Sequence, residues 1–201
     1  RTEGDAVTAD ADPDRIVLAV TGASGTPIAV RTAEELAERV EVIAVVSDAA
    51  EAVMAHEMDD PDAARERLES AATTVYGEDA LAAPIASGST DVDGMVVAPC
   101  SMNTLAGIAH GRADTLVTRA ADVTLKERRR LVVVPREVPL DQRHIENMLT
   151  LAELGVDVVP PMLGFYFDPE SVDDLVDHVV GKVLERFDLD HDLYASWGGD
   201  G

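Results

Sequence analysis

The sequence predicts a single α/β domain, a three-layer sandwich in which helices cover both faces of a doubly wound parallel sheet. Short runs rich in valine and isoleucine, such as RIVLAVT and LVVV, are typical of strands buried on both faces of a parallel sheet. These runs alternate with segments of helical periodicity. A chain of 201 residues is long enough for one domain with a sizeable core.

Most of the expected elements are bounded by a turn, a cap or a proline. Pro27 suits the first turn of a helix, Asp48 and Ser171 are suited to cap helices, and Pro99 and Pro135 are expected to stop strands. The strands are expected over residues 15–21, 40–46, 94–98, 131–134 and 156–159. The helices are expected over residues 28–39, after Asp48, over 102–109, 114–128, 142–154 and 172–187, and in parts of the acidic stretch 58–78.

The domain is expected to span residues 15–187, without an internal linker or repeat. Its last helix has the clearest pattern, with apolar residues at i, i+3 and i+4 spacing from Val172 to Phe187. Residues 1–14 read as a disordered acidic tail. Residues 188–201 form a second, largely polar tail that carries Trp197.

Charge is the strongest oddity of the composition. The 39 acidic and 16 basic residues give a formal net charge of −23. Such a surface offers no positive field for phosphate, which excludes nucleic acids and anionic membranes as partners. A hydrophobic content of 46% argues against disorder. The balance is typical of proteins from a halophilic archaeon, in which molar salt screens the self-repulsion.

The single cysteine, Cys100, excludes an internal disulfide and fits a reducing compartment. No apolar run approaches the ~20 residues needed to span a bilayer, and the acidic start lacks the apolar stretch of a secretory signal. We therefore expect a cytoplasmic protein. No histidine lies at an informative spacing from Cys100, so we expect a buried, inert thiol there.

Four features follow strand ends, where parallel sheets bind ligands. They are the turn GASG at residues 22–25, Ser47, the segment PCSMNT at residues 99–104, and the tripeptide PRE at residues 135–137. The turn alone is ambiguous, because glycines are also needed for ordinary turns, and it is neither a dinucleotide nor a P-loop fingerprint. Ser101 suits an ordinary helix cap, but the cluster of hydroxyls and an amide favours ligand binding.

Lysine is almost absent. The chain has only two lysines, Lys126 and Lys182, beside fourteen arginines. These two are therefore candidates for roles that need a compact ammonium and that a planar guanidinium cannot fill. The alternative is that the two lysines are present by chance and have no special role, since Lys182 lies on the polar side of a predicted helix.

Four segments of the chain resemble the UbiX flavin prenyltransferases. These are TGASG after the first strand, PCSMNT after the third, RAADVTLKERRRLVVVPRE, and HIENMLTLAELGVDVVPPMLGFY. The resemblance covers most of residues 15–187. It implies a Rossmann-like flavoprotein fold and a homododecamer. It also implies a metal-independent transfer of a dimethylallyl group from dimethylallyl phosphate, or in some members the diphosphate, to N5 and C6 of reduced FMN. The prenylated FMN would serve UbiD-type decarboxylases.

The resemblance also implies roles for individual residues. FMN would be held by Gly22, Ala23, Ser24, Ser47, Ser101, Met102, Asn103, Thr104 and Arg136. The prenyl phosphate would meet Arg119, Lys126, Arg136, Tyr166 and Lys182. The expected catalytic residues are Ser24, Glu57, Lys126 and Glu137, and no metal site is expected. Lys182 stands where many members have arginine, which keeps the charge and changes the geometry.

Two alternatives remain open at this point. An FMN-dependent cysteine decarboxylase shares the implied fold, but that class relies on an early histidine and a Pro-x-Met-Asn motif, where this chain has PPMLGFY. A noncatalytic flavin-binding protein would be expected to have lost its charged phosphate contacts, whereas all the residues expected to make them are present.

The acidic composition yields a test of salt dependence. We expect the melting temperature, followed by circular dichroism, to fall when KCl is lowered from molar concentration to about 0.1 M, because carboxylates then repel over a longer range. Equal melting temperatures at the two salt concentrations would contradict the halophilic interpretation.

Overall fold

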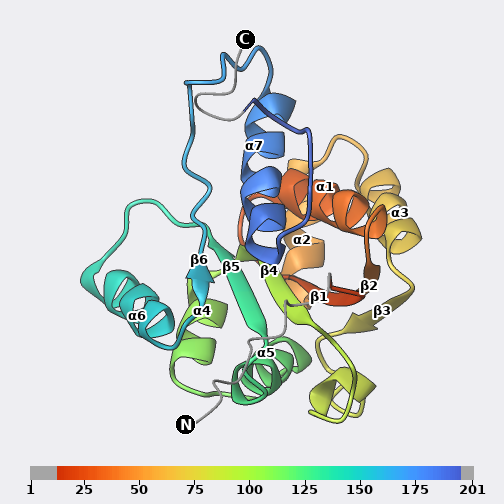
Figure 1. Cartoon of the computed structure of the whole chain (residues 1–201), viewed down its shortest axis with the longest axis vertical. Coiled ribbons are helices and arrows are strands. Elements are labelled where there is room, and N and C mark those ends of the chain that lie inside the picture. The colour runs from red at the N-terminus through yellow and green to blue at the C-terminus, as the bar shows by residue number, and fades with distance from the viewer. Residues whose placement is uncertain (1–12, 196–201) are drawn as a thin grey trace, which may run out of the picture.

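The computed structural model describes residues 13–195, which form a parallel sheet in the order β3-β2-β1-β4-β5-β6 (Figure 1). The chain steps outward from β1 to β3, returns to place β4 beside β1, and continues outward to β6. This order confirms the predicted doubly wound parallel sheet. The strands are β1 Arg15–Val20, β2 Glu41–Val46, β3 Thr74–Gly77, β4 Gly94–Cys100, β5 Arg130–Pro135 and β6 Asp157–Val158.

Helices cover both faces of the sheet, as predicted (Figure 1). Ile16 and Leu18 face a core built with α1 and α7, whereas Val17 and Ala19 face a core built with α4, α5 and α6. This alternation follows from the two-residue period of a strand. The helices are α1 Thr26–Ala37, α2 Asp48–Glu57, α3 Pro61–Ala71, α4 Met102–Ala109, α5 Leu116–Lys126, α6 Gln142–Glu153 and α7 Val172–Leu184, with short 3-10 turns at η1 Pro84–Ala86 and η2 Glu185–Phe187.

The acidic stretch 58–78 contains α3 and also β3, a strand that the sequence did not predict. β3 lies at the edge of the sheet and pairs only with β2. Its four residues are exposed or half-buried. An edge strand needs no continuous apolar run, so its pattern in the sequence is weak.

Some predicted boundaries were wrong. Ser47 caps α2, because its backbone is extended and its Oγ accepts a hydrogen bond from the Ala50 amide at 3.1 Å, whereas Asp48 is already helical. Pro99 and Pro135 lie within the ends of β4 and β5 instead of stopping those strands before them. The cap at Ser171 is confirmed, since its Oγ accepts from the Asp174 amide at 3.1 Å.

The described part of the C-terminal segment packs back onto the domain. Leu189 and Leu193 contact the core between the sheet, α1 and α7. Of the expected N-terminal tail, residues 1–12 lie outside the described residues, as does Trp197. Asp14 already belongs to the sheet, because its carbonyl accepts a hydrogen bond from the Glu41 amide at 2.9 Å.

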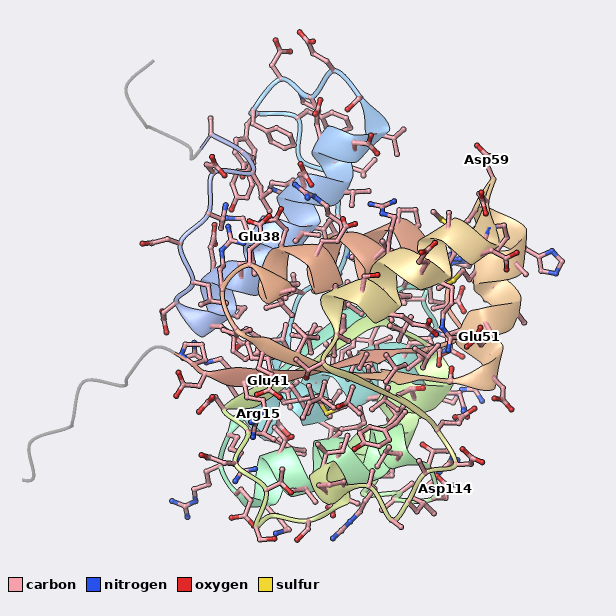
Figure 2. All side chains as sticks on the ribbon, turned by 90° about the vertical axis from the view of Figure 1, so that its right-hand side faces the viewer. Arg15, Glu38, Glu41, Glu51, Asp59 and Asp114 are labelled. Atoms are coloured by element: carbon pink, nitrogen blue, oxygen red, sulfur yellow. The ribbon has the colours of Figure 1, made fainter. Side chains whose placement is uncertain are left out.

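Acidic side chains are spread over the surface. Figure 2 labels Glu38, Glu51, Asp59 and Asp114, which are all exposed and belong to separate segments. Dispersed carboxylates repel one another less than a single cluster would. Within residues 13–195, no helix has both the length and the apolar composition required to cross a bilayer.

Thr21 joins the two halves of the sheet where their crossovers diverge. Its side chain is buried, its amide and Oγ1 donate to the Pro99 carbonyl at 3.3 and 2.8 Å, and the Ser101 amide donates to Oγ1 at 2.8 Å. The carboxyl ends of β1 and β4 are thereby held together by one hydroxyl. Thr32 on α1 is the opposite case, because its Oγ1 is buried with no hydrogen-bond partner among the described residues.

This contrast gives a matched pair of variants. Thr21→Val should lower the free energy of unfolding by about 1–3 kcal/mol, because the partly buried Ser101 amide loses its acceptor. Thr32→Val should leave it unchanged or raise it by about 1 kcal/mol, because an unpaired buried hydroxyl is replaced by a methyl group. Urea unfolding in molar KCl measures both, and equal effects would contradict the role of Thr21.

Candidate active site

Two adjoining cavities, of about 380 and 270 Å³, lie at the carboxyl ends of β1, β2, β4 and β5. Both are lined by Gly22 and Ser101, so we treat them as one feature, the edge groove. The larger cavity is also lined by Ala23, Ser24, Glu57, Met102, Arg136 and Glu137. The smaller cavity is also lined by Ser47, Asn103, Thr104, Arg112, Thr115 and Thr118. All nine residues predicted to hold the flavin therefore meet in the groove.

The N-terminus of α4 supplies the polar end of the groove. Ser101 Oγ accepts a hydrogen bond from the Thr104 amide at 3.2 Å and donates to Thr104 Oγ1 at 3.0 Å, which confirms Ser101 as the N-cap. The amides of the first helical turn point toward the N-terminus, where the helix dipole favours an anion. Hydroxyls of Thr115 and Thr118, which form the capping box of α5, lie at the same cavity.

Two glycines let the turn at residues 22–25 pack closely against neighbouring segments. A methyl group at Gly22 would clash with the side chain of Ala49 on α2, and Gly25 has a φ of +126° that disfavours other residues. Glu57 accepts hydrogen bonds from the amides of Gly25 and Thr26, each at 2.9 Å. Glu57 therefore takes up the first amides of α1, and the turn does not offer them to an external anion.

Glu57 is held as a carboxylate. Its partial burial alone would raise its pKa, but hydrogen bonds from the Ser24 hydroxyl and from the backbone amides of Gly25 and Thr26 lower the pKa below the ordinary glutamate value. Ser24 and Glu57 are thus joined by a hydrogen bond.

Arg136 closes the groove from the end of β5. Its amide donates to the Cys100 carbonyl at 3.1 Å, and its Nε donates to the Ser24 carbonyl at 3.3 Å. The neighbouring Glu137 lines the same cavity, and its Oε1 accepts from the Val138 amide at 3.0 Å. A guanidinium and a carboxylate therefore stand side by side at one end of the groove.

Cys100 lies beneath the groove as an inert thiol. Its side chain is fully buried, and burial raises the pKa of the thiol far above its ordinary value. A nucleophilic cysteine needs a lowered pKa and access to substrate. The expectation of an unreactive cysteine agrees with this environment.

Comparison with known proteins supplies the family. Residues 6–184 match the family model described as Flavoprotein. A probable UbiX-like flavin prenyltransferase of Streptomyces sp. (strain D7) is 50% identical over 187 residues, which cover 92% of each chain. The chain belongs to the UbiX-type flavin prenyltransferases.

Two solved structures of UbiX relatives share the fold. One is a dodecameric FMN-dependent UbiX-like decarboxylase from Escherichia coli O157:H7, 46% identical, with a TM-score of 0.87 over 92% of this chain and 100% of that one. The other is AnUbiX (PadA1) in complex with FMN and dimethylallyl pyrophosphate, 42% identical, with a TM-score of 0.88 over 94% of this chain and 99% of that one.

The other residues predicted from the UbiX resemblance lie away from the edge groove of their own chain. Lys126 ends α5 and pairs with Glu127, beside the amino end of β5, whereas Arg136 follows the carboxyl end. Arg119 donates from Nε to the Ala86 carbonyl at 3.0 Å and pairs with Asp122 at 2.8 Å. Tyr166 and Lys182 belong to a separate cluster along α7, described below.

Sequence reasoning missed several groove residues, among them Thr21, Arg112, Thr115 and Thr118. The helix predicted over residues 114–128 begins two residues later, at Leu116, so Thr115 is its N-cap, and Thr118 in its first turn completes the capping box. The pair of threonines three residues apart could have revealed this. No sequence signal marks Arg112, which pairs with Asp114 at 3.3 Å at the mouth of the groove.

Proposed function

We propose that the protein transfers a dimethylallyl group from dimethylallyl phosphate to reduced FMN and so makes the prenylated FMN used by UbiD-type decarboxylases. The C1–O bond of the donor breaks, and phosphate leaves with the electron pair. N5 of the flavin bonds to C1 and loses its proton. A second bond, from flavin C6 to C3 of the prenyl unit, closes the ring after the alkene takes up a proton, and the C6 proton is lost. No metal ion is required.

One observation carries this proposal: the edge groove joins a hydroxyl-rich cavity at a helix N-terminus to a larger cavity that Arg136 and Glu137 line. The first cavity suits the ribityl phosphate of FMN, through Ser47, Asn103 and Thr104. The second suits the flavin ring, which Gly22, Ala23 and Met102 would contact. The relative AnUbiX, which holds FMN and dimethylallyl pyrophosphate in its crystal structure, supports this assignment.

The groove also supplies groups for the proton steps. Glu137 would pass a proton to the departing phosphate and accept one during ring closure. Ser24 and Glu57, which are joined by a hydrogen bond, would manage the proton on the flavin nitrogen. Arg136 would stabilise the negative charge that develops on phosphate, and the electron-rich flavin would face the cationic C5 fragment.

The remaining phosphate contacts would come from other copies of the chain. Lys126 and Arg136 flank opposite ends of β5, a strand whose length of about 20 Å prevents them from meeting in one subunit. The same prenyl phosphate can contact both only at a boundary between subunits, together with Arg119, Tyr166 and Lys182. A dodecamer, the state of the Escherichia coli relative, would provide such boundaries.

An apolar surface suited to assembly lies on α6. Leu151 is the only fully buried residue in this helix, whereas Ile145 and Leu149 are 55% and 58% exposed. Val138, in the loop before the helix, directly follows Glu137 in the chain. It adds another exposed apolar side chain, at 77% exposure. Exposed apolar side chains beside a proposed site favour contact with a second copy.

Mass spectrometry of the flavin tests the reaction. After anaerobic incubation with reduced FMN and dimethylallyl phosphate in molar KCl, the extracted flavin should be heavier by one C5 unit. Glu137→Gln should lower the rate by about 10²–10⁴ while FMN affinity stays within about twofold, because only proton transfer is lost. Unchanged flavin with both the phosphate and the diphosphate donor, despite tight FMN binding, would contradict the proposal.

Co-assembly tests the shared site. Homo-oligomers of Lys126→Ala and of Glu137→Gln should each be inactive. Mixed oligomers, co-expressed with two tags and purified on both, should regain activity, because some grooves then combine an intact Glu137 with Lys126 from a neighbour. Mixed oligomers as inactive as their parents would mean that each groove uses its own Lys126.

A further inference from the structure

A second group of aromatic and ionisable side chains lies along α7, outside the edge groove. Three segments meet there: the loop after β6, α7 itself and the C-terminal residues 188–195, and Figure 1 shows the loop and the C-terminal segment running beside the helix. The resemblance assigns a role to only two members, Tyr166 and Lys182. We call the group the α7 cluster, and its members are Tyr166, Phe167, His178, Lys182, Glu185, His191 and Tyr194.

His178 is the central residue of the α7 cluster. Its side chain is 8% exposed, and its Nε2 lies 2.9 Å from the phenol oxygen of Tyr166. Phe167 stacks on the imidazole with ring centroids 4.8 Å apart and an interplanar angle of 16°. Tyr194 packs against it edge-on, also at 4.8 Å. Two aromatic rings therefore fix the plane of the imidazole, and the imidazole fixes the phenol.

The protonation state of His178 decides what Tyr166 can donate. A neutral imidazole has one N–H donor and one acceptor, and the phenol has a single hydrogen. When Nε2 carries the proton, it donates to the phenol oxygen, and the phenol then acts as a donor toward its other neighbours, a bound ligand included. When Nδ1 carries the proton, Nε2 is an acceptor and the phenol donates its hydrogen to it. Burial and the positive charge of Lys182 lower the pKa of His178, although Glu185 opposes them, so the ring is neutral near pH 7.

The cluster also places a cation close to the imidazole, because the charge of Lys182 acts on His178. Lys182 follows His178 by one helical turn, so both side chains leave the same face of α7. Lys182 Nζ lies 5.0 Å from the centre of the Tyr194 ring that packs on His178, and 3.0 Å from a carboxylate oxygen of Glu185. A phenol and an ammonium that both neighbour the same imidazole suit an oxyanion with several acceptor oxygens.

We propose that His178 is a positioning residue for prenyl transfer: it donates from Nε2 to the Tyr166 phenol and so aims the phenol hydrogen, together with Lys182, at the phosphate of the prenyl donor. This inference rests on the proposed function, which supplies the phosphate. His178 acts through Tyr166 and makes no contact with the donor. Its replacement should therefore impair use of the donor and spare the flavin.

Two substitutions separate the hydrogen bond from the packing. His178→Phe keeps the stack with Phe167 and Tyr194 but removes the donor. It should lower kcat/KM for dimethylallyl phosphate about tenfold and change FMN affinity less than about twofold. His178→Gln places an N–H near the position of Nε2 and should recover most of the loss. His191→Phe, a change of another histidine in the same cluster, is the matched control and should stay within about twofold of wild type.

The double variant with Tyr166→Phe tests whether the two residues act as a unit. In that background, His178→Phe should cause no further loss, because the phenol that it positions is gone. A further tenfold loss would mean that His178 acts through packing and would overturn the proposal. So would full activity of His178→Phe in the otherwise unchanged protein.

The tautomer of His178 gives a measurement that does not depend on activity. Solid-state NMR of the sedimented ¹⁵N-histidine-labelled protein, assigned with His178→Phe, should show a protonated Nε2 and an unprotonated Nδ1. An Nδ1-protonated ring would overturn the proposal even if prenyl transfer is found. Failure of the wild-type protein to prenylate FMN would instead overturn the proposed function, and the tautomer would still decide whether His178 presents the phenol hydrogen to a ligand.

Discussion

The buried hydroxyl of Thr21 fixes the geometry on which the edge groove depends. A doubly wound sheet has one place where neighbouring strands send their chains in opposite directions, and no backbone ladder continues beyond that point. Here the β1 chain turns toward α1 and the β4 chain turns toward α4. The Thr21 hydroxyl donates to the Pro99 carbonyl and accepts from the Ser101 amide. These two hydrogen bonds fix the distance between the ends of β1 and β4 at the point where the two turns begin. The glycine turn and the N-terminus of α4 consequently form two walls of one groove.

Under the proposed function, the length of a strand then divides the chemistry between subunits. Side chains that follow β5 reach the groove, whereas side chains that precede it lie at the other edge of the sheet, about 20 Å away. Folding one chain therefore assembles the groups proposed to face the flavin and leaves Lys126 outside the groove, paired with Glu127. Under the proposed assembly, the exposed apolar face of α6, adjacent in the chain to Glu137, links subunit contact to completion of the site.

The sequence was informative where the signal is local and uninformative where it depends on packing. Valine-rich runs predicted five of the strands because strands buried on both faces need continuous apolar residues. β3 has a single neighbour and needs no such run, so it was missed. Caps at Ser101 and Ser171 follow from residue type and position. The contacts of Glu57 with Gly25, of Arg136 with Ser24 and of Tyr166 with His178 join residues distant in the chain, and only the fold brings them together.

Under the proposed function, the net charge of −23 requires phosphate recognition to rely on local contacts. A protein with this charge repels anionic substrates over a Debye length, which is about 10 Å in 0.1 M salt and about 3 Å in molar salt. At the shorter range, only groups that touch the phosphate matter. Both lysines are held by carboxylates, Lys126 by Glu127 and Lys182 by Glu185. A phosphate that binds either lysine must displace its carboxylate. The phosphate gains more binding free energy from neutral donors that are already oriented, such as the amides of a helix N-terminus or a phenol fixed by an imidazole. No counterion has to leave these groups first.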